Sequence, residues 1–133
     1  MTTITSHKKT IAASAETIFE FLSDFNNLQD LMPNKVVNWN STMTTCAFTI
    51  ENMAHMNMAY GKNIKNEKIE MVSEGKNPFT YDLSTNISKI DESNSEVSVV
   101  FNGDMNAMIA MMAKKPLQNF VDVLVDRLQE KYS

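Results

Sequence analysis

Cysteine and glycine are scarce in this sequence, and each scarcity excludes a class of site. Cys46 is the only cysteine, so the chain can form no internal disulfide and no cysteine-based zinc cluster. The chain has three glycines. Loops that cradle phosphate groups need glycine because the backbone must come close to the ligand, so we expect no such loop here.

An excess of basic charge and a long apolar run are also lacking. The net charge is −4, the lysines are scattered, and the pair Lys114-Lys115 is too short to form a basic patch. A general nucleic-acid-binding protein normally carries a basic face, so this class is disfavoured. No stretch approaches the roughly 20 apolar residues that cross a bilayer, and residues 1–14 contain no apolar run typical of a signal peptide. We therefore predict a soluble cytoplasmic protein with no integral membrane segment and no nucleic-acid partner.

Methionine, in contrast, is abundant, with 11 among the 133 residues. Hydrophobic residues make up 43% of the chain, which is enough for the core of one ordinary domain, and we assign residues 1–133 to a single domain. The methionine side chain is unbranched and polarisable, so it fills irregular apolar space. Two interpretations stay open: the methionines fill the core, or they line a deformable ligand pocket.

Residues 104–132 form the only long segment with a helical hydrophobic period, and the other elements are organised around it. Its apolar residues are expected on one face: Met105, Met108, Ile109, Met112, Leu117, Phe120, Val121, Leu124 and Leu128. This pattern predicts an amphipathic helix with Asp104 as its N-cap. Proline removes a backbone hydrogen bond, so at Pro116 the helix either kinks or gives way to a second helix. The methionine-rich part before Pro116 is a candidate lid over a cavity.

Upstream of this helix the hydrophobic period is mostly two, which predicts strands. The pattern gives a strand over 2–11, helices over 15–23 and 28–31, and further strands near 36–41, 44–51, 56–64, 68–75, 79–90 and 96–102. Ser14 is the expected N-cap of the first helix. Consecutive strands joined by short turns form an antiparallel meander, and strict alternation means that one face is covered. The long helix is the only predicted element large enough to cover it.

The segment KKTIAASAETIFEFLSDFNNLQDLMP, residues 8–33, indicates a strand followed by short helices that end in Met-Pro. It resembles the opening of the START/SRPBCC superfamily, which includes the birch pollen allergen, lipid-transfer START domains and polyketide cyclase-like proteins. Trp39 follows where such chains often place a tryptophan. The segment KPLQNFVDVLVDRLQEKY, residues 115–132, resembles the closing helix. With these segments the resemblance covers essentially the whole chain.

The resemblance implies an α+β helix-grip fold. Its curved antiparallel sheet, of about six or seven strands, wraps around a long C-terminal helix, and two short helices follow the first strand. A cavity between sheet and helix often holds a lipid, a sterol or a polyketide in that superfamily. No invariant catalytic set defines the superfamily, so the resemblance assigns no catalytic residue.

The titratable side chains form no catalytic or metal-binding pattern. His7 and His55 lie far apart in the sequence and lack the spacing of metal ligands. Cys46 falls on the apolar face of its strand, where a free cysteine behaves as a small hydrophobe. Carboxylates such as Asp82 fall on the polar faces of their strands. We therefore predict no catalytic residue, no metal site and no cofactor.

The leading hypothesis is a binding module that holds a small hydrophobic or amphipathic molecule, lipid-like or polyketide-like, between sheet and helix. The expected walls are Trp39, Cys46, Phe48, Met56, Met58, Tyr60, Met71, Phe79, Tyr81, Phe101, Met105, Met108 and Met112. Tyr60 and Tyr81 are either core residues or groups that orient the polar end of a ligand. One alternative is a cyclase-like or hydratase-like enzyme, which needs an acid or base in the cavity. Another is an interaction protein with a self-filled core. Whichever function holds, we expect the chain to be a monomer or a homodimer.

Overall fold

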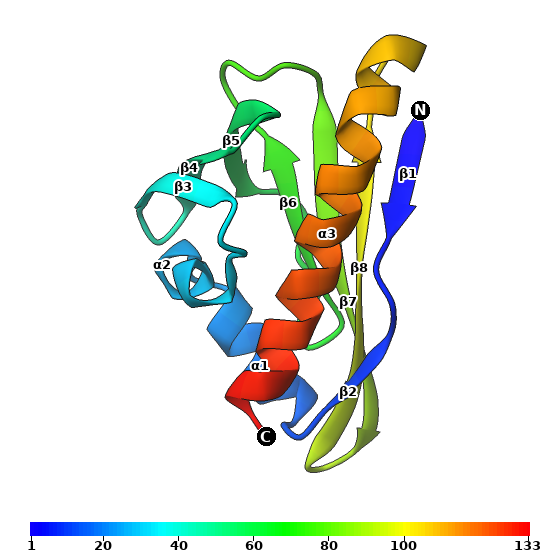
Figure 1. Ribbon diagram of the computed structural model, residues 1–133. Helices are drawn as coiled ribbons and strands as arrows, with labels where there is room; N and C mark the ends of the chain where they lie inside the picture. Colours follow the sequence, from blue (N-terminus) through cyan, green and yellow to red (C-terminus); the bar gives the residue numbers. More distant parts are fainter.

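A curved antiparallel sheet wrapped around one long helix, α3, makes up most of the molecule (Figure 1). The computed structural model describes all residues from 1 to 133. The strands are β1 (Thr2–Thr5), β2 (Lys9–Ile11), β3 (Val36–Ser41), β4 (Thr45–Ile50), β5 (Ala54–Tyr60), β6 (Lys68–Ser73), β7 (Tyr81–Asp91) and β8 (Asn94–Gly103). The helices are α1 (Ala15–Leu22), α2 (Phe25–Leu28), the short 3₁₀ helix η1 (Gln29–Leu31) and α3 (Ala107–Lys131).

The eight strands form one sheet with the order β1-β8-β7-β6-β5-β4-β3, and β2 also pairs with β8. The predicted first strand is therefore two strands, because the chain leaves the ladder between β1 and β2. Ser6 fills the gap with its side chain: the Val99 N–H donates to Ser6 Oγ at 2.8 Å, and the Ser6 N–H donates to the Val99 carbonyl at 2.8 Å. The order from β3 to β8 is the meander that the short turns predicted.

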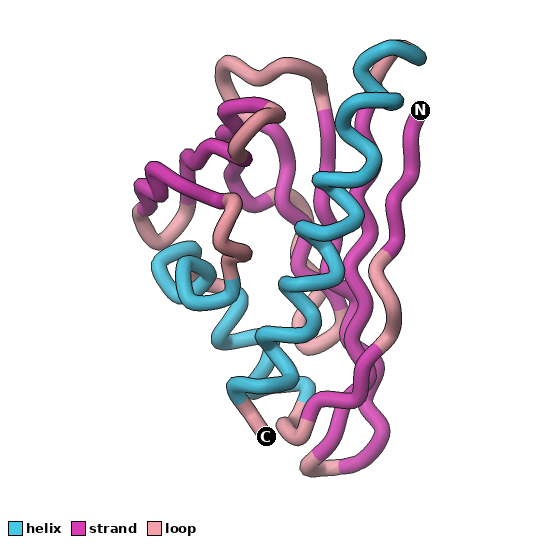
Figure 2. The backbone as a smooth tube through the Cα atoms, in the orientation of Figure 1, coloured by secondary structure: helices cyan, strands magenta, loops and turns pink.

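The two helical segments after β2 pack beneath α3 (Figures 1 and 2). Ser14 caps α1 as predicted, since its Oγ accepts from the Thr17 N–H at 3.1 Å. The second segment begins earlier than expected. Asp24, which lies in the expected gap between the helices over 15–23 and 28–31, caps α2 by accepting from the Asn26 N–H at 2.9 Å. Helix η1 then ends at Leu31, two residues before Pro33.

Helix α3 is one continuous helix that includes Pro116, so the two-helix alternative is wrong. The prediction of Asp104 as N-cap is also wrong. The Asp104 N–H donates to the Thr80 carbonyl at 2.8 Å, which keeps Asp104 alongside the loop before β7. Asn106 is the N-cap instead, and its Oδ1 accepts from the Ile109 N–H at 2.9 Å.

The two halves of α3 differ in burial, and this corrects the predicted apolar face. After Pro116 the buried residues are Leu117, Phe120, Val121, Leu124, Val125 and Leu128. Before it, Met108 and Met112 are 74% and 69% exposed, so the prediction that they point inward is wrong. Leu117 is five positions after Met112, and this step turns the helix about 140° past a full turn. The position in phase with the buried face is Ala113, which is buried.

Candidate functional site

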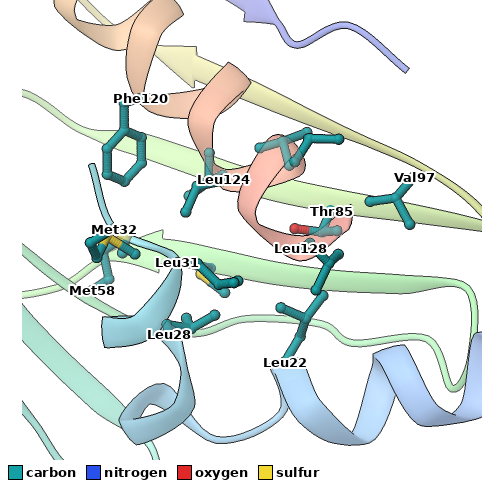
Figure 3. Close-up of a pocket in the computed structure, with 14 residues that line it drawn as sticks. Leu22, Leu28, Leu31, Met32, Met58, Thr85, Val97, Phe120, Leu124 and Leu128 are labelled. Carbon is teal, nitrogen blue, oxygen red and sulfur yellow. The ribbon is translucent and has the colours of Figure 1, made fainter. Parts of the chain in front are cut away.

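The space between α3 and the sheet contains a small apolar void, which we call the inner cavity (Figure 3). Its volume is about 20 Å³. Its 14 lining residues are Leu22, Leu28, Leu31, Met32, Met58, Met71, Leu83, Thr85, Val97, Val99, Phe120, Leu124, Val125 and Leu128. A void of this size holds about one water molecule, so the protein's own side chains fill most of the interior.

Every layer of the fold contributes to the inner cavity. Strands β5 to β8 supply the sheet wall, because alternate residues such as Leu83 and Thr85 point to the same face. The second half of α3 supplies the opposite wall, and α1, α2 and η1 close the side. Thirteen of the 14 residues are hydrophobic, and Thr85 is the only polar one. The wall is therefore suited to an apolar molecule and offers a single hydroxyl.

The structure places the predicted wall residues in several different environments. Met58 and Met71 line the inner cavity. Cys46, Phe48, Met56, Tyr81, Phe101 and Met105 are buried elsewhere in the core, and Trp39, Tyr60 and Phe79 are half-buried against it. Met108 and Met112 lie on the surface, away from the cavity. The cavity wall seen here is shifted along the fold from the predicted one, toward α1 and the second half of α3.

The two tyrosine hydroxyls are engaged by the main chain. Tyr60 donates to the Leu22 carbonyl at 2.5 Å, and Tyr81 donates to the Asn57 carbonyl at 2.9 Å. Burial raises the pKa of both phenols above the ordinary tyrosine value; for Tyr60, the nearby Asp24 adds to the effect. Both groups therefore stay neutral and hold β5 and β7 in place, as the core interpretation expects.

Cys46 and the histidines lie outside the inner cavity. Burial raises the pKa of the Cys46 thiol to about 12, so it is not a nucleophile at neutral pH. His7 Nε2 lies 2.7 Å from Asp126 Oδ1, and this contact ties the link between β1 and β2 to α3. His55 Nδ1 lies 3.1 Å from Thr49 Oγ1 on the sheet. No group of three or more histidine, cysteine, aspartate and glutamate side chains is arranged to hold a metal ion.

A second hollow opens on the surface beside Pro116, and we call it the Pro116 cleft. Its volume is about 380 Å³. It is lined by Pro33, Lys35, Ile50, Glu51, Asn52, Lys115, Pro116, Asn119 and Phe120. These residues come from the loop before β3, the end of β4 with the turn that follows it, and α3. Sequence reasoning missed this site because three separate segments build it, and none of them carries a motif.

Phe120 also belongs to a stack of aromatic rings that crosses the fold. Its ring centroid lies 5.7 Å from that of Phe48 on β4, with the ring planes 9° apart. Phe48 in turn stacks on Trp39 of β3, with centroids 5.4 Å apart. The pairing register shifts between Val37 and Asn40, so a bulge accompanies Trp39 at this end of the stack.

Solved structures with the same arrangement extend over nearly the whole chain. A START superfamily protein from Mycobacterium smegmatis matches with a TM-score of 0.71 and 16% identity, over 98% of this chain and 96% of that one. A protein from Thermus thermophilus matches with a TM-score of 0.77 and 13% identity, over 98% and 97%. A point mutant of norcoclaurine synthase from Thalictrum flavum, in complex with a transition-state analogue, matches with a TM-score of 0.70 and 12% identity, over 99% and 96%.

These likenesses define the class of fold: the chain has the helix-grip fold of the START superfamily. The fold class predicted from the sequence is thereby confirmed, with eight strands in place of six or seven. No protein-family model matches the sequence, and no curated protein sequence matches it. None of the helices has the length and apolar character needed to cross a lipid bilayer.

Proposed function

We propose that this protein binds a small hydrophobic or amphipathic molecule between the sheet and α3. The observation that carries the proposal is the wall of the inner cavity, in which 13 of 14 residues are hydrophobic. Ligand sites are mostly apolar with a few placed polar groups, and here Thr85 is the polar group. The START fold supports such a role in general.

Binding requires that the inner cavity expand, because about 20 Å³ is too little for an organic molecule. Met32, Met58 and Met71 line the cavity, and methionine changes its shape more readily than branched residues do. An apolar side chain that leaves the core gives up roughly 1.5–3 kcal/mol. A ligand that fills the same space replaces this burial, so the expanded state is stabilised by the ligand itself.

The second candidate is an interaction protein whose core is filled by its own side chains. The small volume of the inner cavity favours it, and the exposed Met108, Met111 and Met112 offer an apolar surface to a partner. The cyclase-like or hydratase-like alternative has less support from the cavity wall, because Thr85 is its only polar side chain and a catalytic acid or base is needed there.

The methionines allow a test with an internal control. Methyl-labelled methionine gives one NMR signal per residue, and decanoate or decan-1-ol serves as the probe. Binding in the core is expected to shift the signals of Met58 and Met71, while the exposed Met108 and Met111 keep theirs.

A titration that moved only the exposed methionines would contradict the proposal and favour a surface contact. A titration that moved no methionine signal would favour the self-filled core. Native mass spectrometry of the protein purified from its own host would then show whether a natural ligand stays bound.

A further inference from the structure

We propose that the ligand enters through the Pro116 cleft, that Phe120 is the gate between this cleft and the inner cavity, and that Lys35 and Lys115 recognise an anionic group on the ligand. This inference rests on the proposed binding function and deepens it. It predicts a ligand class: an amphipathic molecule with an apolar tail and a carboxylate-like head.

Phe120 is the only residue that lines both the Pro116 cleft and the inner cavity. It is 3% exposed, and in Figure 3 it stands at one end of the inner cavity, beside Met32 and Met58. Leu22, Leu128 and Val97 lie toward the other end. A rotation of the Phe120 ring away from this position would join the Pro116 cleft to the inner cavity. The first side chains inside would then be Met32 and Met58.

The two sides of the cleft differ in how firmly they are held. On one side, the Glu51 N–H donates to the Lys35 carbonyl at 2.9 Å, which ties the loop before β3 to the turn after β4. On the other side is α3, where Pro116 has no N–H to donate to the Met112 carbonyl. One backbone hydrogen bond is therefore missing one turn before Phe120. The helix can adjust at this point more easily than the tied loops can.

The charges around the cleft favour an anion. Lys35 and Lys115 line it from opposite sides, and both are exposed. Neither has a carboxylate within ion-pair distance, because all three close ion pairs of the molecule involve His7 or Lys9. Glu51 is the only acidic residue in the lining, so two positive groups outnumber one negative group in a protein whose net charge is −4.

The cleft also offers polar side chains that suit a carboxylate head. Asn52 and Asn119 are in the lining, and each carries an amide NH₂ that can donate. Lysine ammonium groups at an exposed rim contribute more to selection and to the rate of encounter than to affinity. The apolar tail supplies the affinity by replacing buried side chains. The two lysines favour an anionic molecule over a neutral one with the same tail.

The charge part of the proposal is tested with decanoate, decan-1-ol and decyl phosphate, each titrated at neutral pH while the methyl signals of Met58 and Met71 are followed. The double variant K35Q/K115Q is expected to weaken decanoate binding by about tenfold and to leave decan-1-ol unchanged. The control is K8Q/K62Q, which removes the same charge from two exposed lysines outside the cleft. This control is expected to leave the binding of all three probes unchanged.

The gate is tested by the rate of exchange between free and bound protein, measured from the line shape of the Met58 methyl signal. Phe120→Leu is expected to raise this rate several-fold. Val121→Ala removes a fully buried side chain of α3 that lines neither the inner cavity nor the Pro116 cleft, and it is expected to leave the rate unchanged.

The outcomes distinguish failure of the gate and head-group assignments from failure of the proposed binding function. If neither decanoate nor decan-1-ol shifts the interior methionines, the binding function fails, and the gate and head-group assignments fail with it. If both bind equally and K35Q/K115Q changes nothing, the binding function stands and the anionic ligand is overturned. If decyl phosphate alone depends on the lysines, the head group is a phosphate and the carboxylate is overturned. If Val121→Ala accelerates exchange as much as Phe120→Leu, Phe120 is not the gate.

Discussion

At the scale of single residues, burial decides which titratable groups can do chemistry. The Cys46 thiol is 4% exposed, and burial raises its pKa from 9.0 to about 12. Burial also raises the pKa of Tyr60 and the pKa of Tyr81. These groups stay protonated at neutral pH, so they act as packing residues and as hydrogen-bond donors to the main chain.

The raised pKa of Cys46 predicts a loss of stability in alkali. The folded protein keeps the thiol proton between pH 9 and about 12, while the unfolded chain releases it, so the free energy of unfolding falls as pH rises through this window. One proton corresponds to a slope of about 1.4 kcal/mol per pH unit. Urea unfolding of wild type and Cys46→Ala at several pH values measures the slopes, and the variant is expected to have the shallower one.

Wild type and Cys46→Ala are compared by the pH dependence of the free energy of unfolding, because the loss of a buried side chain also lowers stability at every pH. Tyr60 and Tyr81 remain in the variant, so part of the slope above pH 10 persists. Equal slopes for wild type and Cys46→Ala between pH 9 and 10 would show that the thiol titrates normally in the folded protein.

Single wall residues were harder to predict than the strands that carry them. Alternation assigns a residue to a face of the sheet, and Met58 and Met71 fell on the correct face. It does not say where along the sheet the cavity lies. Leu22 and Leu31 line the cavity because α1 and η1 fold beneath α3, and this depends on packing between distant segments.

At the scale of elements, α3 combines two parts with different surroundings. The part after Pro116 packs against the sheet and the short helices, while the part before it carries exposed methionines. The sequence predicted the long helix correctly, and of the two alternatives at Pro116 the two-helix one is wrong. It misplaced the methionines because the apolar pattern continues across Pro116 with a step of five positions. This step moves the apolar residues to another face of the helix, which a list of apolar residues alone does not reveal.

The difference in burial predicts a difference in local stability along α3. Amide protons of residues 107–113 are expected to exchange faster than those of residues 117–128, because fewer buried side chains hold the first part in place. Hydrogen exchange followed by mass spectrometry resolves the two parts as separate peptides. Equal protection in both would remove the basis for regarding the methionine-rich part as a lid.

A pair of variants checks the same difference by unfolding. The exposed Met108 and Met112, both replaced by Gln, are expected to change the free energy of unfolding by less than about 0.5 kcal/mol per site. Leu117→Ala removes a fully buried side chain and is expected to cost about 2–5 kcal/mol.

At the scale of the whole molecule, the two candidate functions differ in how the protein responds to an apolar ligand. A molecule that binds only the folded state stabilises it by mass action, roughly 2.7 kcal/mol at a concentration one hundred times its dissociation constant. Thermal unfolding with increasing decanoate is therefore expected to show a rising midpoint. An unchanged midpoint at the highest concentration would favour the self-filled core.

The architecture was predictable from the sequence because each strand carries its own alternation and each turn is short. The resemblance of residues 8–33 and 115–132 to the START superfamily then placed the long helix against the sheet. The Pro116 cleft was not predictable in this way, since Lys35, Asn52 and Lys115 are far apart in the chain and meet only in the folded molecule.

The pairing of β1 with β8 also has a consequence for folding during synthesis. Thr2 on β1 has Gly103 on β8 as its partner, so this pair can form only after the chain has been made as far as β8. Closing so long a loop costs entropy before any contact repays it, and chains with many such distant pairings fold slowly. Until then β7 has an open edge, the kind of surface on which nascent chains aggregate.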